Sequence, residues 1–306
     1  MLDPAQLAAL AAVHRRGSFD LAAAGLHVTP SAISQRIKAL EEATGTLLIR
    51  RGQPCTATGP GLRLIRHHDE VALLERTLAA DLPGQISGLA PGPATLRIAV
   101  NADSLATWVI PALAATTGYL FDLVIDDQDV SQDWLRRGEV VAAITAHPGP
   151  LQGCETIPLG ALRYRSTASP AYMARWFGQG TLPKELTPAL TRAVLQAPAL
   201  TFSEKDRLQD RWIAREIGGK ASRAAIPSHR IASSQAFVDA CLAGLGWGMN
   251  PEPLVRHHLA SGALVELVPD TPLDVPLHWQ FTRLAAPTLR PVTEAIRAAA
   301  RQTLVG

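Results

Sequence analysis

The sequence predicts an α/β fold class with an all-α module at its N-terminus, and three observations lead to this assignment. Residues 1–58 hold helix start signals and helical periodicity, with two short strand-like runs at their end. One long helical pattern follows in residues 62–82. From Thr95 onward strands alternate with helices, which is typical of a parallel sheet. The chain therefore divides into a head (residues 1–58), a connecting segment (residues 59–93) and a body (residues 94–306).

Two helices of the head begin at recognisable capping residues. Ser18 precedes the first of them, and the small residues 22–24 let that helix pack closely. Thr29 and Pro30 start the second, with a capping hydroxyl followed by proline at the first helical position. In this second helix the apolar side chains recur at i, i+4 and i+7 and so face inward: Ile33, Ile37 and Leu40.

A preceding helix and two short strands complete the head. The preceding helix has an apolar stripe within residues 7–13. Residues 47–49 are expected to form a strand, residues 52–54 a turn, and residues 55–58 a second strand. Two strands around such a turn form a wing, which usually contacts backbone phosphates or the minor groove. Three helices with a wing make a winged helix-turn-helix, so the helix that starts at Pro30 is predicted to enter the major groove of DNA.

The outer face of that helix is polar, and we expect this face to meet DNA. Three side chains suit base edges: Ser31, Ser34 and Gln35. Four suit phosphates: Thr29, Lys38, Arg50 and Arg51. Pro30 at the helix start and Thr56 in the wing complete the predicted DNA-binding set. The alternative interpretation is an amphipathic hairpin whose polar face is simply solvated.

The charge of the chain is unevenly distributed. The formal net charge is +2 overall. Residues 1–66 hold eight Arg or Lys and four Asp or Glu, a net of +4, whereas the remainder holds 21 and 23, a net of −2. A basic head on a slightly acidic body fits a nucleic-acid partner that binds at one end.

The composition is that of an ordinary globular protein, with 47% hydrophobic and 18% charged residues. The three cysteines, Cys55, Cys154 and Cys241, are far apart and odd in number, so they predict neither a disulfide framework nor a metal site. We find no signal-peptide pattern and no run of about 18 apolar residues. We therefore expect a cytoplasmic protein that has no membrane segment, no metal and no cofactor.

The connecting segment predicts a long helix and then a linker rich in proline and glycine. Apolar residues recur along the helix at spacings of three and four: Val71, Leu74, Leu78 and Leu82. A helix of this length with one apolar stripe needs a partner, which is either its own body or a second copy. We favour a dimer seam, because one winged module buries only about 600–1,000 Å² on DNA and usually needs a second copy for affinity.

The body shows the rhythm of two α/β lobes with a cleft between them. A second stretch of strand and helix alternation covers residues 166–268. A strand is expected near its end, at 264–267. Outside it, strands are expected at 95–100, 121–126, 140–146 and 277–281, with a polar turn at 101–104 and helices at 105–115, 131–137 and 291–302.

The head and several segments of the body resemble a known family. The run from Phe19 to Arg51, with AAAGLHVTPSAISQRIKALEEATGTLLIRR and then TATGPG, resembles the N-terminal domain of the LysR-type transcriptional regulators. Further segments are similar to the branch that controls basic amino acid export, the LysG/ArgP-type regulators: VNADSLATW, LRRGEVVAAIT, PLGALRY, SSQAFVDACLAGLGWGMNP and LDVPLHWQ. The resemblance covers nearly the whole chain.

This resemblance implies that the body is a two-lobed effector domain of the periplasmic-binding-protein-like kind, type 2. Lobe I is expected to comprise residues 94–165 and 269–306, and lobe II residues 166–268. The chain would then cross between the lobes near residues 165 and 269. The resemblance also implies a homodimer or homotetramer that acts on promoter DNA together with RNA polymerase.

Two segments of the body end a strand and open a helix, which is where ligands bind in open α/β lobes. The first offers Asn101, Asp103, Ser104 and Thr107, and the second offers Ser233, Ser234 and Gln235. Free N–H groups and the positive end of a helix dipole attract a carboxylate at such places. Ordinary N-capping explains either segment alone. Facing one cleft, the two segments together predict a site for a small effector.

Three acids lie at the end of the strand predicted at 121–126: Asp126, Asp127 and Asp129. A solvated acidic turn explains any one of them equally well. The family resemblance implies lysine or arginine as the effector, with its carboxylate at the helix N-termini and its cation on an acid. Asp127 and Asp103 are the candidates for that acid, and the two ends of the effector can also be assigned the other way round.

The sequence holds no G-x-S-x-G elbow, no phosphate-binding G-x-x-x-x-G-K-[ST] loop and no dinucleotide fingerprint, so we predict that the protein is not an enzyme. We predict a DNA-binding transcription factor that responds to a small effector, a basic amino acid, and activates an exporter gene. The alternatives are a LysR-type regulator that responds to an aromatic or aliphatic metabolite, and a solute-binding protein. The sequence leaves open the effector, the target promoter, activation against repression, and dimer against tetramer.

Overall fold

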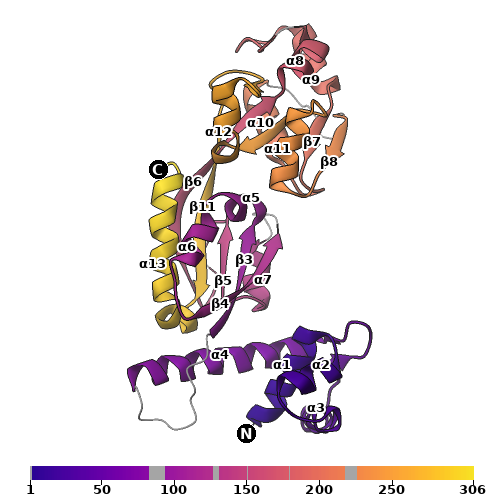
Figure 1. Cartoon of the computed structure of the whole chain (residues 1–306), viewed down its shortest axis with the longest axis vertical. Helices are drawn as coiled ribbons and strands as arrows, with labels where there is room; N and C mark the ends of the chain where they lie inside the picture. The colour runs from indigo at the N-terminus through magenta and orange to yellow at the C-terminus, as the bar shows by residue number, and fades with distance from the viewer. Residues whose placement is uncertain (1, 83–93, 127–130, 150, 179, 218–225) are drawn as a thin grey trace.

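A computed structural model describes residues 2–82, 94–126, 131–149, 151–178, 180–217 and 226–306 (Figure 1). Its head consists of α1 (Pro4–Arg16), α2 (Phe19–Gly25), α3 (Pro30–Thr44) and an antiparallel pair of short strands, β1 (Ile49–Arg50) and β2 (Thr56–Ala57). The predicted winged helix-turn-helix is confirmed.

The predicted caps and inward positions of the head are confirmed. The Ser18 hydroxyl accepts a hydrogen bond from the Leu21 N–H, and the Thr29 hydroxyl accepts one from the Ala32 N–H at 3.2 Å. The apolar positions of α3 are buried in one core with α1, α2 and the start of the wing. Local capping and the i, i+4, i+7 spacing therefore set this domain.

The first strand of the wing was predicted too early, at residues 47–49. Leu47 is exposed, and the N–H groups of Leu48 and Ile49 donate to the Glu41 carboxylate at 2.8 and 3.3 Å. A side chain of α3 thus takes donors that a strand ladder would use, and pairing begins only at Ile49. The second strand is likewise shorter than the predicted 55–58.

The long helix α4 (Gly59–Asp81) begins at the Thr58 cap and is about 35 Å long. It contacts both of its neighbours in the chain: Ile65 lies in the head core, and Leu73 lies in the core of the body. Leu74 and Leu78 remain 46% and 47% exposed. One face of α4 therefore packs within its own chain, while part of the predicted seam stays open to solvent. The linker predicted after this helix lies outside the described residues.

The body is built on one mixed sheet with the strand order β10-β6-β11-β5-β3-β4, in which β9 also pairs with β6. Its three parallel strands carry the predicted βαβ rhythm, and they are β3 (Ala94–Asn101), β4 (Tyr119–Asp126) and β5 (Ala142–Thr145). The other four are β6 (Cys154–Ala168), β9 (Gly248–Pro251), β10 (Val265–Glu266) and β11 (Leu273–Thr282). The mixed α/β fold class is confirmed.

The strand β6 belongs to both halves of this sheet (Figure 1). Its first part pairs with β11, up to the pair Tyr164–Leu273, and its last part pairs with β9, from the pair Tyr164–Pro251. A parallel pair, β7 (Ala199–Thr201) and β8 (Ser228–Arg230), adjoins β9 through the hydrogen bond from the Leu200 N–H to the Trp247 carbonyl. The two halves of the body are thus joined by continuous backbone pairing.

Helices cover the sheet and frame its ends. They are α5 (Ala102–Ser104), the π-helical turn η1 (Leu105–Val109), α6 (Ile110–Ala114), α7 (Ser131–Arg137), α8 (Pro170–Phe177), α9 (Pro188–Gln196), α10 (Leu208–Glu216), α11 (Ser234–Leu242), α12 (Glu252–Ser261), the short 3-10 turn η3 (Arg283–Ala285) and α13 (Ala286–Thr303). In the described part of the chain, no helix combines the length and apolarity needed to cross a bilayer.

Two helix boundaries differ from the sequence prediction. The expected polar turn at 101–104 is helical from Ala102, and the next turn is π-helical before Pro111, whose nitrogen carries no hydrogen to donate. The closing helix begins at Ala286, five residues before Pro291. Burial of Thr288 and Leu289 anchors this extra turn against the body despite the internal proline.

The start of α4 provides a test of how closely the head is packed. A Cβ added at Gly61 would collide with the backbone carbonyl of Leu48, whereas one added at Gly59 meets nothing within 4 Å. We expect Gly61→Ala to destabilise the head by about 1–3 kcal/mol through this overlap. The matched control Gly59→Ala should stay within about 0.5 kcal/mol of the original chain. Urea unfolding followed by circular dichroism measures both, and equal stabilities would contradict the packing described.

Candidate functional site

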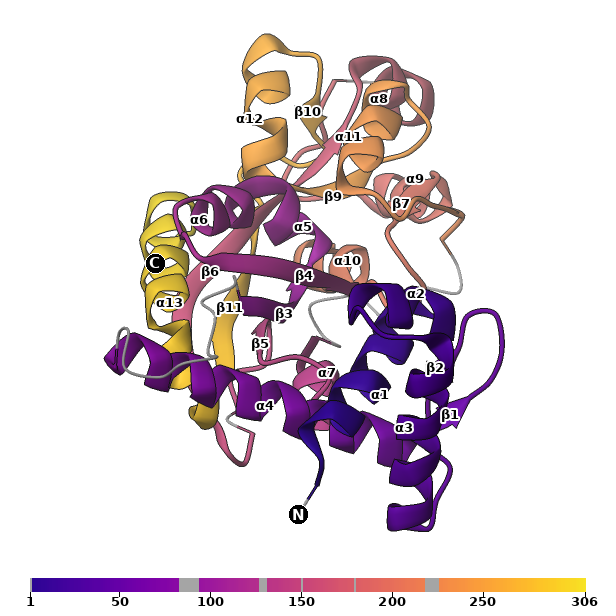
Figure 2. The ribbon, with the colours of Figure 1, turned by 60° about the horizontal axis from the view of Figure 1, so that its bottom comes forward.

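The polar face predicted on α3 is exposed in the structure. Ser31, Gln35 and Lys38 are exposed, and Ser34 is half-buried. Figure 2 shows α3 at the outer side of the head with β1 and β2 beside it. Lys38 forms an ion pair with Glu42 at 3.7 Å, one helical turn away. The face is therefore accessible to a large partner, as entry into a DNA groove requires.

The other predicted contacts surround this face. Thr29 and Pro30 are exposed at the N-terminus of α3, although the Thr29 oxygen is used as the helix cap. Arg50 and Thr56 are exposed on the two wing strands. The Arg51 guanidinium lies 5.3 Å from the centre of the Phe19 ring, so a cation–π contact holds it beside α2.

His14 of α1 contacts the second strand of the wing. Its Nδ1 accepts a hydrogen bond from the Ala57 N–H at 3.3 Å, which requires a neutral imidazole. Burial lowers the pKa of His14 below its ordinary value, and the positive charges of Arg97 and Arg15 act in the same direction. Glu139 and Asp69 oppose this shift.

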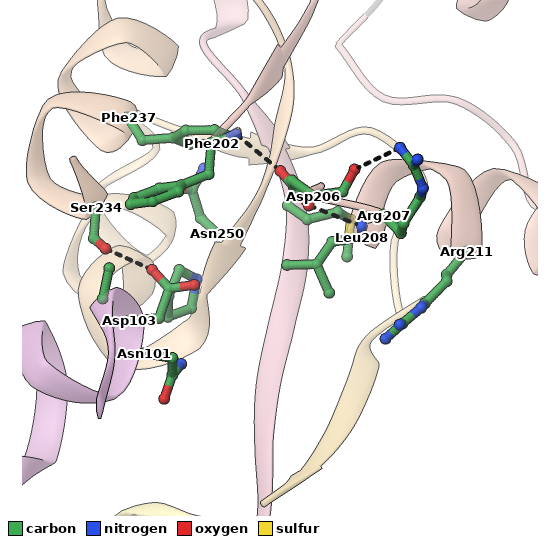
Figure 3. Close-up of a pocket in the computed structure, with 13 residues that line it drawn as sticks. Asn101, Asp103, Phe202, Asp206, Arg207, Leu208, Arg211, Ser234, Phe237 and Asn250 are labelled. Atoms are coloured by element: carbon green, nitrogen blue, oxygen red, sulfur yellow. Dashed lines mark hydrogen bonds between the residues drawn. The ribbon is translucent and has the colours of Figure 1, made fainter. Parts of the chain in front are cut away.

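A pocket lies where the two lobes of the body meet, and Figure 3 shows its lining. Lobe I contributes Asn101, Ala102 and Asp103 from the end of β3 and the start of the helix that follows. Lobe II contributes the rest of the lining: Phe202, Asp206, Arg207, Leu208, Arg211, Ser234, Phe237, Met249, Asn250 and Pro251.

The structure brings together one predicted residue from each lobe. Asp103 accepts a hydrogen bond from the Ser234 hydroxyl at 2.6 Å on one oxygen, and from the Tyr164 hydroxyl at 2.8 Å on the other. Ser234 belongs to α11 and Asp103 to α5, so this carboxylate bridges the cleft. Hydrogen bonds to an ionised carboxylate are the stronger kind, so the bridge favours the arrangement of lobes seen here.

The remaining predicted effector residues differ in their surroundings. Asn101 and Ser104 are buried, and the Asn101 Oδ1 and Ser104 Oγ atoms have no hydrogen-bond partner among the described residues. The Thr107 hydroxyl of η1 donates to the Asp103 carbonyl at the start of the same helical segment, at 2.6 Å. Ser233 caps α11 by accepting from the Ala236 N–H, as an ordinary N-cap does. Gln235 is exposed, and of these residues only Asn101 joins Asp103 and Ser234 in the pocket lining.

Asp127, the other acid predicted to bind a cation, lies outside the described residues, and so does Asp129. Asp126 is the last residue of β4. Asp103 is therefore the predicted acid that the structure places in the cleft.

Sequence reasoning missed the segment between β7 and α10. Asp206 is buried there, accepts from the N–H groups of Phe202 and Leu208 at 2.9 Å each, and has a pKa raised by burial. Arg207 precedes α10 directly and Arg211 lies in its first turns, and both line the pocket with Asp206. The signal was present, since SEKDR follows a strand end, but β7 is only three residues long and was not recognised.

The charged side chains of the pocket lie in two groups. Asp103 lies on one side with Ser234, and Arg207 and Arg211 lie on the other with the buried Asp206 (Figure 3). Arg207 also forms an ion pair with Asp210 at 3.9 Å. Phe202, Phe237 and Leu208 supply apolar surface. Among the described residues, no group of three or more potential metal ligands is found. The arrangement suits a long zwitterion, with a cation at one end and a carboxylate at the other.

Comparison with known protein families gives two matches. Residues 4–62 match the bacterial regulatory helix-turn-helix protein, LysR family. Residues 91–305 match the LysR substrate binding domain. Together the two matches cover most of the chain.

Curated relatives extend over nearly the same length. The transcriptional regulator LysG of Mycobacterium tuberculosis H37Rv is 43% identical over 98% of this chain and 94% of its own. The transcriptional regulator ArgP of Pseudomonas fluorescens Pf0-1 is 41% identical over 100% of this chain and 99% of its own.

Two solved structures are similar over essentially the full length. The crystal structure of ArgP from Mycobacterium tuberculosis has a TM-score of 0.78 and 40% identity, and covers 100% of both chains. Full-length LysG from Corynebacterium glutamicum with bound effector Arg has a TM-score of 0.67 and 33% identity, covering 99% of this chain and 100% of the other.

The state of His14 predicts how the head responds to pH. Because folding lowers the pKa of His14, the head is most stable above the unfolded pKa and loses stability as the pH falls below about 6.5. Protonation also abolishes the bond from Ala57. We expect the His14 ring to titrate below the ordinary histidine value of about 6.5 in NMR, and His14→Gln to flatten the fall in stability between about pH 7 and 5. A His14 ring that titrates at or above about 6.5 would contradict this account.

Proposed function

This chain belongs to the LysR family of bacterial transcriptional regulators, and on that premise we propose that its effector is a basic amino acid, arginine or lysine. The observation that carries the proposal is the separation of charge in the cleft between Asp103 on one side and Arg207 and Arg211 on the other. The similar LysG from Corynebacterium glutamicum is described with bound effector Arg, which supports the same class of ligand.

In the proposed pose the side-chain cation of the effector lies against Asp103. An ammonium or guanidinium group donates to the oxygen that now accepts from Ser234. The α-carboxylate lies against the guanidinium groups of Arg207 and Arg211, and the methylene chain contacts Phe202 and Phe237. This assignment differs from the helix-terminus site expected from sequence, because the two arginines offer a stronger partner than backbone N–H groups alone.

The head is the DNA-reading part of a family of DNA-binding regulators. We assign base contact to Ser31, Ser34 and Gln35, because they line the exposed face of α3. Phosphate contact falls to Thr29, Lys38, Arg50 and Arg51, with Pro30 and Thr56 beside them. Within the head, the Thr29 hydroxyl caps α3 and the Arg51 guanidinium contacts the Phe19 ring.

The functional unit we propose is a homodimer or homotetramer in the cytoplasm, without catalytic activity. The exposed Leu74 and Leu78 of α4 offer a seam for a second copy, while Leu73 stays packed on the body. Effector binding then changes the angle between lobes and so the arrangement of heads on promoter DNA. The output we propose is activation of an amino acid exporter gene through RNA polymerase.

Substitutions at Gln35 and Arg51 test two different properties of DNA binding, sequence specificity and general affinity. Gln35→Ala should relax preference at one base pair by about 1–3 kcal/mol, since it removes a base-edge contact. Arg51→Ala should weaken binding to all sequences alike and reduce the salt slope by about 1. Arg301→Ala, which removes an exposed charge from the body, serves as the control. Fluorescence anisotropy at several salt concentrations measures all three, and unchanged specificity in Gln35→Ala would mean that another face reads the bases.

A thermal-shift screen against the twenty amino acids tests the effector class. Arginine or lysine at about 100 times its dissociation constant should raise the melting temperature by roughly 5–10 °C. Asp103→Asn should weaken this binding at least about tenfold, because it removes the charge that faces the cation. Asp122→Asn removes a charge from exposed β4 instead and should bind as the original chain does. A selective response to an aromatic or aliphatic amino acid would contradict the proposed effector class.

A further inference from the structure

We infer that Tyr164 is a positioning residue of the effector site, which holds the Asp103 carboxylate and ties it to the junction between the lobes. The inference rests on the proposed function, because it concerns the acid that we place against the effector cation. Tyr164 itself does not line the pocket. It acts on the effector through Asp103.

The position of Tyr164 along β6 is the first support. Tyr164 is the last residue of β6 that pairs with β11, opposite Leu273 in lobe I, and the first that pairs with β9, opposite Pro251 in lobe II. A rotation of one lobe against the other must be absorbed near such a change of partner, because backbone pairing on either side keeps each half of the strand with its own lobe. The Tyr164 backbone therefore sits where the angle between lobes is set.

The side chain of Tyr164 is the second support. It is fully buried in the body core, and its hydroxyl donates to the Asp103 carboxylate at 2.8 Å. A buried phenol needs a hydrogen-bond partner, and this one uses a carboxylate at the edge of the cleft. The ring contributes packing that phenylalanine would supply equally well. The hydroxyl is what connects the core to the site.

The second oxygen of Asp103 completes the linkage. It accepts from Ser234 of lobe II at 2.6 Å, so one carboxylate joins the junction strand, lobe I and lobe II. While Tyr164 holds one oxygen, the other is aimed at the cleft, where Ser234 and the effector cation compete for it or share it. Binding of the cation therefore alters the contact across the cleft without releasing Asp103 from the junction.

The experiment uses the full-length protein and calorimetric titration with L-arginine and L-lysine. Tyr164→Phe keeps the ring and removes one hydroxyl, and we expect it to weaken binding about tenfold. In the Asp103→Asn background the same substitution should change the affinity less than about twofold, because its partner's charge is already gone. The matched control is Tyr172→Phe, since Tyr172 is equally buried but donates to the Pro198 carbonyl in lobe II. This control should leave the affinity unchanged.

Two results would overturn the inference: an affinity in Tyr164→Phe equal to that of the original chain, and an equal loss in the Asp103→Asn background. The first result would show that the Tyr164 hydroxyl does not affect effector binding. The second would show that it affects binding independently of Asp103. Failure of the original chain to bind either amino acid would instead overturn the proposed effector.

If neither amino acid binds, the role of Tyr164 can still be tested by measuring the distance between the lobes without effector. Spin labels on cysteines introduced at Arg297 of α13 and His257 of α12 report the distance between lobes, since both positions are exposed. Tyr164→Phe should shift or broaden the distance distribution, and Tyr172→Phe should not. Identical distributions in the original chain and Tyr164→Phe would show that this residue does not set the angle between lobes.

Discussion

The paired strands β6 and β11 place both lobes of the body in one continuous sheet. Backbone hydrogen bonds run along them from Cys154 to Tyr164, and β6 then continues into lobe II beside β9. Stretching or breaking such a ladder costs several hydrogen bonds at once, so relative motion of the lobes is restricted to bending near the end of the pairing. The cleft opens beside this point, which makes its shape depend on a small change of angle.

The head is joined to lobe I rather than to the cleft. Leu73 of α4 lies in the body core, its carbonyl accepts from the Thr288 hydroxyl at 3.4 Å, and Arg76 donates to the Gly118 carbonyl at 2.7 Å. In the state described, the head and lobe I therefore act as one unit, and lobe II is the part free to respond to an effector. Such a response reaches DNA only if lobe II or the cleft alters how copies of the chain contact one another, which is why an oligomer is central to the proposed mechanism.

The helices of the head could be predicted from local capping residues, whereas part of the cleft could not be predicted because it depends on pairing between distant segments. Ser18 and Thr29 are caps that act within three residues, so sequence alone placed the helices they start. Asp103 and Ser234 were identified because each follows a strand end, although their direct bond across 131 residues was not foreseen. Tyr164 and Asp206 were missed because their roles depend on the register of β6 against β9 and on a strand of three residues. Neither feature has a periodic signal in the sequence.

The central claim is that the cleft recognises the side-chain cation of its effector through Asp103. Calorimetric titration with L-arginine and with L-citrulline, which has the same length but no charge on its side chain, tests this most directly. The account predicts that arginine binds and that citrulline binds at least about a hundredfold more weakly, because the charge-assisted contact is lost. Equal affinity for the two ligands would contradict it and would show that the cleft recognises the shape and the α-amino acid group alone.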